Sequence, residues 1–212
     1  MTTRPPHAPA GRPEPDAPRL RTPSSDVRAA LEVAAVRVIE RDGRAGLTVR
    51  AVAAEAGVAP MGVYNHLQGK SGLLVAVLAS GFDGLTEAVT WNSALDPETA
   101  FFEVGRGYRR FVLSRPVTYG LMFGGGVPAD VHSQIAEHAL PAFQALLDTV
   151  QHSQHAGLVR PGPAEPLAMC IWSAVHGAVG LELAAESPAE TGEGVYESVL
   201  RMIVDGLAPR GR

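Results

Sequence analysis

Gly69, Lys70 and Ser71 are the residues of this 212-residue chain that match the end of a phosphate-binding loop. Lys70 is the single lysine in the sequence, against seventeen arginines. A nucleotide-binding loop of the G-x-x-x-x-G-K-[ST] type follows a strand and begins with a glycine five residues before the second one. Tyr64 occupies that position, and the preceding segment has a helical pattern. The sequence therefore argues against a nucleotide site and leaves Lys70 to bind another kind of phosphate. Gly69 and Ser71 instead fit the turn and the cap of a helix that we expect from Gly72 to about Ala94.

Other combinations of reactive side chains are sparse. His152 and His155 are three residues apart on an expected helix, as some metal-ligand pairs are, yet only Asp148 lies near them. We interpret this pair as exposed and expect neither a metal nor a cofactor. The sequence contains no G-x-S-x-G, no H-E-x-x-H and no paired carboxylates in an apolar segment. We therefore do not expect an enzyme.

The N-terminal third of the chain is basic, and the remainder is acidic. Residues 1–72 carry ten Arg and Lys against seven Asp and Glu, whereas residues 73–212 carry eight against fifteen. A basic region on an acidic protein indicates contact with a polyanion, although a solvated surface produces the same pattern. Cys170 is the only cysteine, so no intrachain disulfide can form. No apolar run approaches the roughly 20 residues of a membrane span, so we expect a cytoplasmic protein without membrane contact.

The elements that must position these residues are helices. Hydrophobic residues make up 46% of the chain, as in folded proteins, and they recur at helical spacing from residue 25 onward. In no segment do apolar and polar residues alternate with period two, as they do in a half-buried strand. The expected fold class is therefore all-α. Residues 1–24 hold seven prolines and four arginines, too few apolar side chains to fold. We predict a disordered arm there, which is either a solvated tail or a contact to phosphate.

Two short segments carry the most specific pattern in the chain. Thr48 precedes a helix over 49–56 that Gly57 ends, and another helix begins at Pro60 after a three-residue turn. Glycine supplies the positive φ that a tight turn needs, and proline is tolerated at a first helical position. The pattern predicts a helix-turn-helix, whose second helix reads the major groove of DNA. An ordinary helical hairpin with an exposed Tyr64 is the alternative.

The outward residues of the second of these helices follow from its spacing. Val63 and Leu67 are four residues apart and face the core, so Met61, Tyr64 and Asn65 face outward. A large aromatic side chain and an amide on the exposed face of a short helix indicate that this face binds a partner. This favours contact with DNA.

Residues 46–78, GLTVRAVAAEAGVAPMGVYNHLQGKSGLLVAVL, resemble the DNA-binding region of the TetR family of bacterial transcriptional regulators. Members of that family have a Thr-capped helix, an A-x-x-x-G-V turn, a Tyr-x-His-aromatic run and a lysine shortly after. The matching residues here are Thr48, Ala53, Gly57, Val58, Tyr64, His66 and Lys70. Leu67 stands where the family usually has phenylalanine, which keeps the position apolar. The resemblance extends over about residues 25–80.

The resemblance implies a DNA-binding role for each matching position. Thr48 would cap its helix and touch phosphate, and Arg50 would either reach a guanine or remain a solvated charge. Tyr64 would contact the DNA backbone or a thymine methyl group, and His66 would contact a base or pack against the turn. Lys70 would bind a backbone phosphate. The outward positions that vary within the family are Pro60, Met61 and Asn65.

A second resemblance lies near the C-terminus. Residues 171–183, IWSAVHGAVGLEL, contain a W-x-x-x-H-G pattern similar to one C-terminal subtype of the same family. Trp172 and His176 of this pattern either border a ligand cavity or pack in the core. The ligand-binding residues that we predict are Phe102, Phe111, Met122, Phe123, Phe143, Trp172 and His176. A wider set adds Phe82, Tyr119 and Met169, and we expect at most half of all these residues to touch a ligand.

Together the patterns and the resemblance imply a regulator in two parts. We expect a helix-turn-helix DNA-binding domain over 25–72 and a helical ligand-binding and dimerisation domain over 73–212. A homodimer would bind two half-sites of a palindromic double-stranded operator. A small apolar molecule of unknown identity would release this repressor from the operator. The alternative is a helical small-molecule-binding protein that does not bind an operator.

Overall fold

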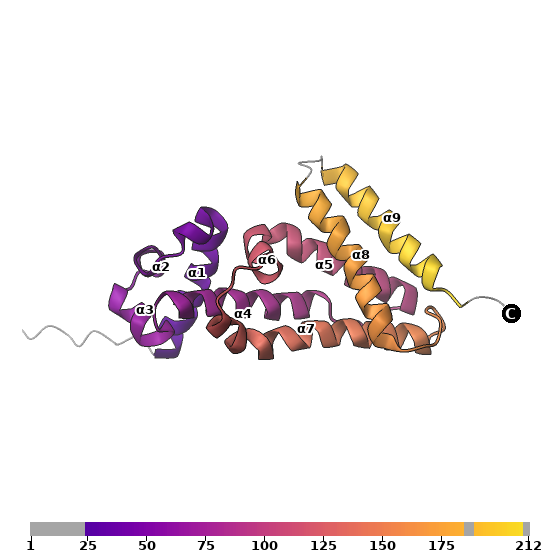
Figure 1. Ribbon diagram of the computed structural model, residues 1–212, viewed down its shortest axis with the longest axis horizontal. Helices are drawn as coiled ribbons and strands as arrows, with labels where there is room; N and C mark the ends of the chain where they lie inside the picture. Colours follow the sequence, from indigo (N-terminus) through magenta and orange to yellow (C-terminus); the bar gives the residue numbers. More distant parts are fainter. Residues whose placement is uncertain (1–23, 185–188, 210–212) are drawn as a thin grey trace, which may run out of the picture.

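The computed structural model describes residues 24–184 and 189–209, which form nine α-helices and no strand. This confirms the all-α prediction. The predicted arm, apart from Ser24, lies outside the described residues. The helices, shown in Figure 1, are α1 Ser24–Gly46, α2 Val49–Ala56, α3 Pro60–Leu67, α4 Lys70–Ala88, α5 Pro97–Ser114, α6 Pro116–Phe123, α7 Ala129–His155, α8 Ala164–Ala184 and α9 Ala189–Leu207.

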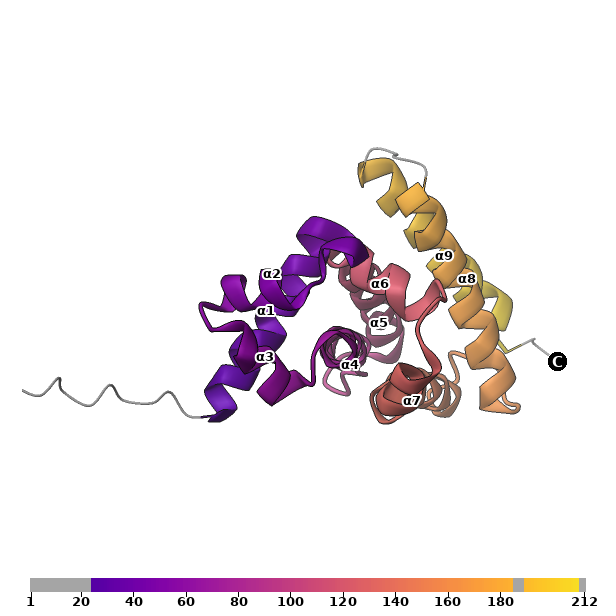
Figure 2. The same cartoon turned by 60° about the vertical axis from the view of Figure 1, so that its left-hand side comes forward.

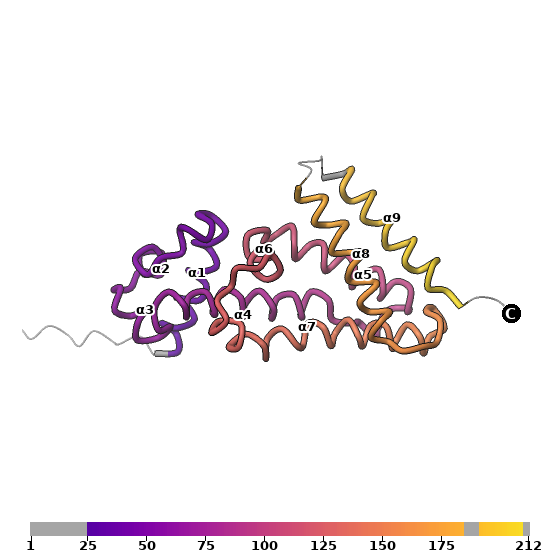
Figure 3. The backbone as a smooth tube through the Cα atoms, in the orientation of Figure 1, coloured from indigo at the N-terminus to yellow at the C-terminus, as the bar shows by residue number. Residues whose placement is uncertain are grey.

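The molecule is elongated, with α1, α2 and α3 gathered at one end. We call these three helices the head and α4–α9 the body. Figure 3 shows α4 and α7 running lengthwise side by side from the head into the body, with α5 and α6 next to them. The pair α8 and α9 lies at the far end, and Figure 2 shows this pair well separated from the head. The long α4 therefore connects the two ends of the molecule.

The head follows the local sequence signals closely. The side chain of Thr48 caps α2 by accepting a hydrogen bond from the Ala51 N–H at 3.2 Å. Gly57 ends the helix with φ 68°, in the left-handed region that glycine adopts without strain. Pro60 is at the first position of α3. The predicted bounds of α2 and the predicted start of α3 are confirmed.

The bounds of α4 differ from those that its sequence pattern predicts. We expected a helix from Gly72 to about Ala94 with Ser71 as its cap, but α4 begins at Lys70 and Gly69 is the cap residue. Gly69 has φ 83°, and its carbonyl already accepts the Leu73 N–H at 3.1 Å. The backbone therefore turns into the helix two residues earlier than expected, without a side-chain cap.

Two apolar clusters form the core. The first joins the head to the body, since it combines residues of α1–α3 with Leu73, Val77 and Phe82 of α4. The second lies within the body and includes Leu85, also from α4, with residues of α5 to α9. The packing of the head therefore continues along α4 as far as Phe82.

The length and apolar composition of α8 correct one expectation from the sequence. We expected no apolar run of membrane-spanning length, yet α8 is long and apolar enough to cross a membrane. Leu167, Ile171, Val175 and Val179 form its buried face within the second apolar cluster. A single such helix is weak evidence for a membrane span, because packed core helices have the same length and composition.

Candidate nucleic-acid interface and ligand cavity

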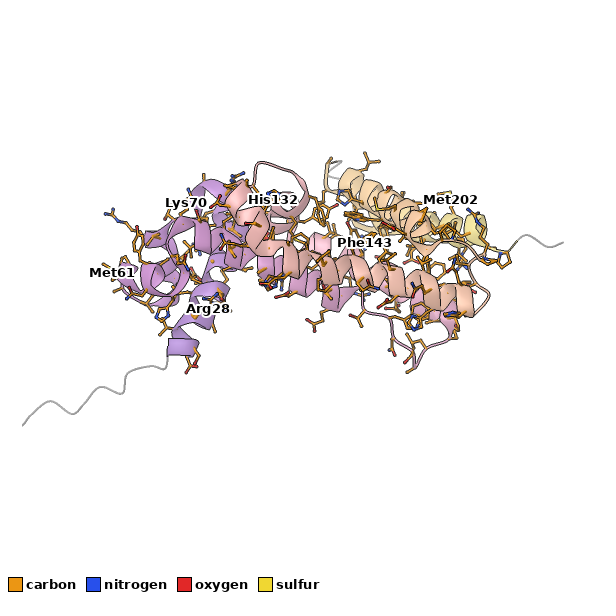
Figure 4. All side chains as sticks on the ribbon, turned by 60° about the horizontal axis from the view of Figure 1, so that its bottom comes forward. Arg28, Met61, Lys70, His132, Phe143 and Met202 are labelled. Carbon is orange, nitrogen blue, oxygen red and sulfur yellow. The ribbon has the colours of Figure 1, made fainter. Side chains whose placement is uncertain are left out.

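Helix α3 presents large side chains to solvent. Val63 and Leu67 are buried against the rest of the head, so the opposite side of the helix faces outward. Met61 is 65% exposed and Tyr64 56% exposed, and both are among the most exposed large apolar side chains in the described residues. Figure 4 shows Met61 at the end of the molecule opposite Met202. The exposed face of α3 is thus at the tip of the head.

The ring of Tyr64 is held against the turn between α3 and α4. A Cβ atom placed on Gly69 would lie only 3.1 Å from Cε1 of this tyrosine. Gly69 therefore serves two purposes, since it adopts a positive φ and leaves room for the ring. The Arg28 guanidinium donates to the His66 carbonyl at 3.0 Å and ties α1 to the end of α3. These contacts fix the orientation of α3 within the head.

Three cations in or next to the head have no partner. Arg37 of α1, Arg50 of α2 and Lys70, the first residue of α4, are exposed, and none of them forms an ion pair or a hydrogen bond within the described part of the chain. Arg41, in contrast, binds Glu55 at 2.9 Å and so joins α1 to α2. An exposed cation without a partner keeps its full capacity to bind a phosphate.

The eight predicted DNA-binding residues lie within a short stretch that runs from the cap of α2 to the first residue of α4. Seven of them are exposed, and His66 is half-buried. Thr48 is both an exposed residue and the cap of α2. The exposed residues are Thr48, Arg50, Pro60, Met61, Tyr64, Asn65 and Lys70.

The body contains a partly open cavity of about 250 Å³. Helices α4, α5, α7 and α8 supply most of its wall. The lining residues are Phe82, Leu85, Val89, Phe101, Val104, Gly105, Tyr108, Phe123, Ala139, Ala142, Phe143, Leu146, Thr149, Ile171, Trp172, Val175 and Leu200. No charged side chain lines this cavity in the described residues, so its chemistry suits an apolar molecule.

The cavity brings together some of the residues predicted to bind a ligand. Phe123, Phe143 and Trp172 line it, as does Phe82 of the wider set. The Trp172 ring lies 5.7 Å from Phe123 and 6.3 Å from Phe143, between ring centroids. These aromatic side chains come from α4, α6, α7 and α8, so they meet only when the helices pack.

Four of the predicted residues lie outside the cavity wall. Phe102 packs beneath the Arg201 guanidinium, 4.5 Å from the ring centroid, and Phe111 packs beneath Arg115 at 5.8 Å. Met122 lies against Gly81, where a Cβ atom would be 2.8 Å from the methionine sulfur. His176 lies behind the wall and contacts it through Phe123, at 5.1 Å between ring centroids. Met169 of the wider set is 43% exposed.

The part of the wall that α5 supplies was not predicted from the sequence. Phe101, Val104, Gly105 and Tyr108 all line the cavity. Their spacing of three, one and three residues is that of one helical face. Gly105 also leaves room for Leu200 of α9, whose Cδ2 would lie 2.5 Å from an added Cβ atom. A search for helical faces in place of isolated aromatic residues would have found this stripe.

Three polar side chains meet next to the cavity. The hydroxyls of Tyr108 and Tyr119 lie 2.9 Å and 2.8 Å from the same nitrogen, Nδ1 of His176. Burial raises the pKa of both tyrosine hydroxyls and lowers the pKa of the His176 imidazole. Burial therefore favours the uncharged form of all three groups.

Helix α6 connects the cavity with the head. The Glu40 carboxylate of α1 accepts hydrogen bonds from the backbone N–H groups of Thr118 at 2.8 Å and Val117 at 3.2 Å. These bonds cap the N-terminus of α6 with a side chain from the head. Arg44 of α1 donates to the Gly126 carbonyl at 2.6 Å, just beyond the end of α6. The last residue of α6 lines the cavity, so one short helix contacts both regions.

The chain matches two family models and several curated relatives. The model of bacterial regulatory proteins of the tetR family matches residues 32–77, and the tetracyclin repressor-like C-terminal domain matches residues 101–205. The HTH-type transcriptional regulators Mb1846 of Mycobacterium bovis and Rv1816 of Mycobacterium tuberculosis are each 24% identical over 226 residues. These alignments cover 86% of this chain and 94% of each relative.

Solved structures share the same arrangement of helices. A protein of unknown function from Rhodococcus sp. RHA1 is 25% identical with a TM-score of 0.73, over 92% of this chain and all of that one. A putative TetR-family regulator from Rhodococcus sp. is 22% identical with a TM-score of 0.67, over 84% of this chain and 99% of that one. Because the two family models together span more than half of the sequence, this chain belongs to the TetR family of ligand-responsive, DNA-binding transcriptional regulators.

Proposed function

We propose that this regulator is a repressor that binds a palindromic operator as a homodimer and leaves it when a small apolar molecule fills the cavity. The observation that carries the proposal is the double contact of α6, whose N-terminus binds Glu40 of the head while Phe123 lines the cavity. A ligand that displaces α6 must also strain or break the Glu40 hydrogen bonds. Occupation of the cavity therefore changes the position of the head.

The size of this effect depends on the ligand's affinity for the protein in each of two states, one for each position of the head. A ligand shifts an equilibrium only by the ratio of its affinities for the two states. If the ligand fitted the cavity of the DNA-binding state without moving α6, its binding would not release the DNA. The direct contact between α6 and the cavity supports such a difference in affinity.

We assign operator contacts to the exposed residues of the head. Lys70 binds a backbone phosphate and Arg50 reaches a guanine, and Met61, Tyr64 and Asn65 of α3 enter the major groove. The remaining contacts come from Thr48, Pro60 and His66. The DNA-binding domain then comprises residues 25–72, and the ligand-binding and dimerisation domain comprises residues 73–212.

The outer faces of α8 and α9 support the homodimer. Leu181 is 73%, Met202 64% and Val195 57% exposed. Such large apolar side chains on neighbouring helices are costly in water and favour burial against a second copy. Gly177, on the W-x-x-x-H-G pattern that we assign to the C-terminal subtype, is exposed as well. We place this dimer in the cytoplasm, where its DNA is.

A gel-shift assay with DNA from upstream of the protein's own gene tests the proposal. We expect specific retardation, with an affinity that falls steeply as salt rises, and weaker binding after addition of n-butylbenzene as an apolar probe. Deletion of the gene should raise transcription from the retarded promoter. Retardation without increased transcription would exclude repression, and the absence of retardation at any salt concentration would favour a small-molecule-binding protein without an operator.

A further inference from the structure

The wall of the cavity has a buried part and a half-buried part. Leu85 of α4, Val104 of α5 and Leu200 of α9 line it and are each at most 8% exposed. The half-buried lining residues, among those that the structure describes, all belong to α6, α7 and α8, and they are Phe123, Ala139, Ala142, Phe143, Leu146 and Trp172. Since the cavity is partly open, its opening lies on this side. We call these six residues the mouth.

Three aromatic rings from three helices meet at the mouth. The Trp172 ring of α8 lies 5.7 Å from Phe123 of α6 and 6.3 Å from Phe143 of α7, between ring centroids. Figure 4 shows Phe143 on the side of α7 toward α8. A half-buried ring that lines the cavity contacts both its interior and water. The mouth is therefore the boundary between an apolar interior and the solvent.

The polar groups of the inner wall are already used within the protein. The Thr149 hydroxyl donates at 2.9 Å to a carbonyl one turn earlier in α7. The Tyr108 hydroxyl is hydrogen-bonded to the side chains of Tyr119 and Trp172, and it lies 2.9 Å from Nδ1 of His176. No charged side chain lines the cavity in the described part of the chain. A polar group of a ligand would therefore lose its hydration inside without gaining a donor or a counter-charge, which is unfavourable.

We propose that the effector is a small, mainly apolar molecule with one uncharged polar group at one end, and that it binds with this end at the mouth. Its apolar part lies against Leu85, Val104 and Leu200 and leaves water, while the polar group stays hydrated beside Phe143 and Trp172. The cavity volume of about 250 Å³ is just below the roughly 300–1,000 Å³ typical of ligand pockets. This inference rests on the proposed function, since it defines the chemistry and orientation of the effector.

Two isomeric alcohols test where the cavity tolerates a polar group. The hydroxyl of 4-phenylbutan-1-ol is at the end of the chain, and that of 1-phenylbutan-1-ol is beside the ring. Calorimetric titration of the full chain gives the affinity for each. We expect the terminal alcohol to bind about tenfold more tightly, because the internal hydroxyl loses its hydration whichever end of the molecule lies at the mouth. Equal affinities, tighter binding of the internal alcohol, or binding of neither would overturn the proposal.

Two hydrocarbons control for the shape of these alcohols. In n-pentylbenzene and 2-phenylpentane, a methyl group replaces the terminal and the internal hydroxyl, respectively. Their affinities should differ much less than those of the two alcohols. An equally large difference between the hydrocarbons would show that shape, and not hydration of the hydroxyl, separates the alcohols, and would refute the proposal.

A charge placed at the mouth tests the orientation. The long side chain in Phe143→Lys can hold its ammonium in water, and Phe143→Met is the matched uncharged control. The affinity for 4-phenylbutyrate relative to 4-phenylbutan-1-ol should be about threefold higher in Phe143→Lys than in Phe143→Met, the effect of one exposed ion pair. For 4-phenylbutylamine the relative affinity should fall. If Phe143→Lys does not fold, Ala139→Lys and Ala139→Met make the same comparison, and equal relative affinities would refute the orientation.

The same ligands distinguish this inference from the proposed function. The gel shift is repeated with each alcohol at saturation. Tighter binding of the terminal alcohol together with unchanged DNA affinity would support the orientation and refute release by a ligand. Release of DNA by both alcohols, with equal affinities in the calorimeter, would support the function and refute the orientation.

Discussion

The head and the cavity place their functional residues in opposite ways. The candidate DNA-binding residues come from one short segment, residues 48–70, and are positioned by local signals such as the Thr48 cap and the Gly57 turn. The cavity collects side chains from Phe82 to Leu200, which six helices bring together. A local motif keeps its geometry wherever it is attached, whereas a cavity exists only in one packing of the whole body.

The two regions also differ in their electrostatics. Arg37 and Arg50 of the head and the adjacent Lys70 are exposed without partners, while no charged side chain lines the cavity in the residues described. Cations in water remain available for phosphate, and an apolar wall excludes ions. The head is therefore suited to a polyanion and the body to a neutral molecule. Glu40 and α6 are where the two regions meet.

The largest expected effect comes from a substitution that unfolds the head alone. Val63 is fully buried in the first apolar cluster, so Val63→Asp places an unpaired carboxylate in the head and destabilises it by about 3–5 kcal/mol. We expect DNA retardation to disappear while calorimetric titration still detects binding of n-butylbenzene. The control is Val33→Asp, the same change at a 52% exposed position of α1. Loss of both activities would mean that the two regions unfold together.

Filling the cavity should remove the response to the ligand. Ala142 lines the cavity on α7, so Ala142→Phe occupies the space that the ligand needs. We expect calorimetry to detect no binding of n-butylbenzene, and we expect addition of n-butylbenzene to leave the DNA affinity of this variant unchanged. Leu140→Phe is the control on the same helix, at a position that is 69% exposed. Retained ligand binding in Ala142→Phe would place the ligand elsewhere.

Weakening the link between the regions should leave each intact. Glu40→Gln removes the charge that accepts from the Val117 and Thr118 N–H groups. Hydrogen bonds to a charged group contribute about 1.5–3 kcal/mol, so we expect the ligand-induced change in DNA affinity to fall roughly tenfold. Calorimetry should show unchanged ligand affinity. Glu32→Gln, elsewhere on α1, should leave the response as it is in the wild type.

The smallest expected effect is that of a single phosphate contact. Lys70→Ala should weaken binding to all DNA sequences by a few-fold and reduce the slope of log affinity against log salt by about one. The preferred bases should not change. Arg110→Ala removes an exposed charge from the body and serves as the control. A changed base preference in Lys70→Ala would show that this lysine reads sequence.

The sequence by itself determined the all-α class and the head. Caps, glycine turns and a proline at a first helical position act within a few residues, so Thr48, Gly57 and Pro60 predicted α2 and the start of α3. The start of α4 was missed by two residues because a glycine cap leaves no side-chain signal. The prediction against a nucleotide-binding loop rested on Tyr64 and on the helical pattern of the segment before it.

Only the tertiary structure decided which aromatic residues surround the cavity. Phe101 and Phe102 are adjacent and equally apolar, yet the first lines the cavity and the second lies beneath Arg201. Their difference depends on the rotation of α5 against α4, α7 and α8, which is set by the sum of many contacts. The meeting of Tyr108, Tyr119 and His176 has the same origin. Helical periodicity assigns residues to faces, and packing decides what each face meets.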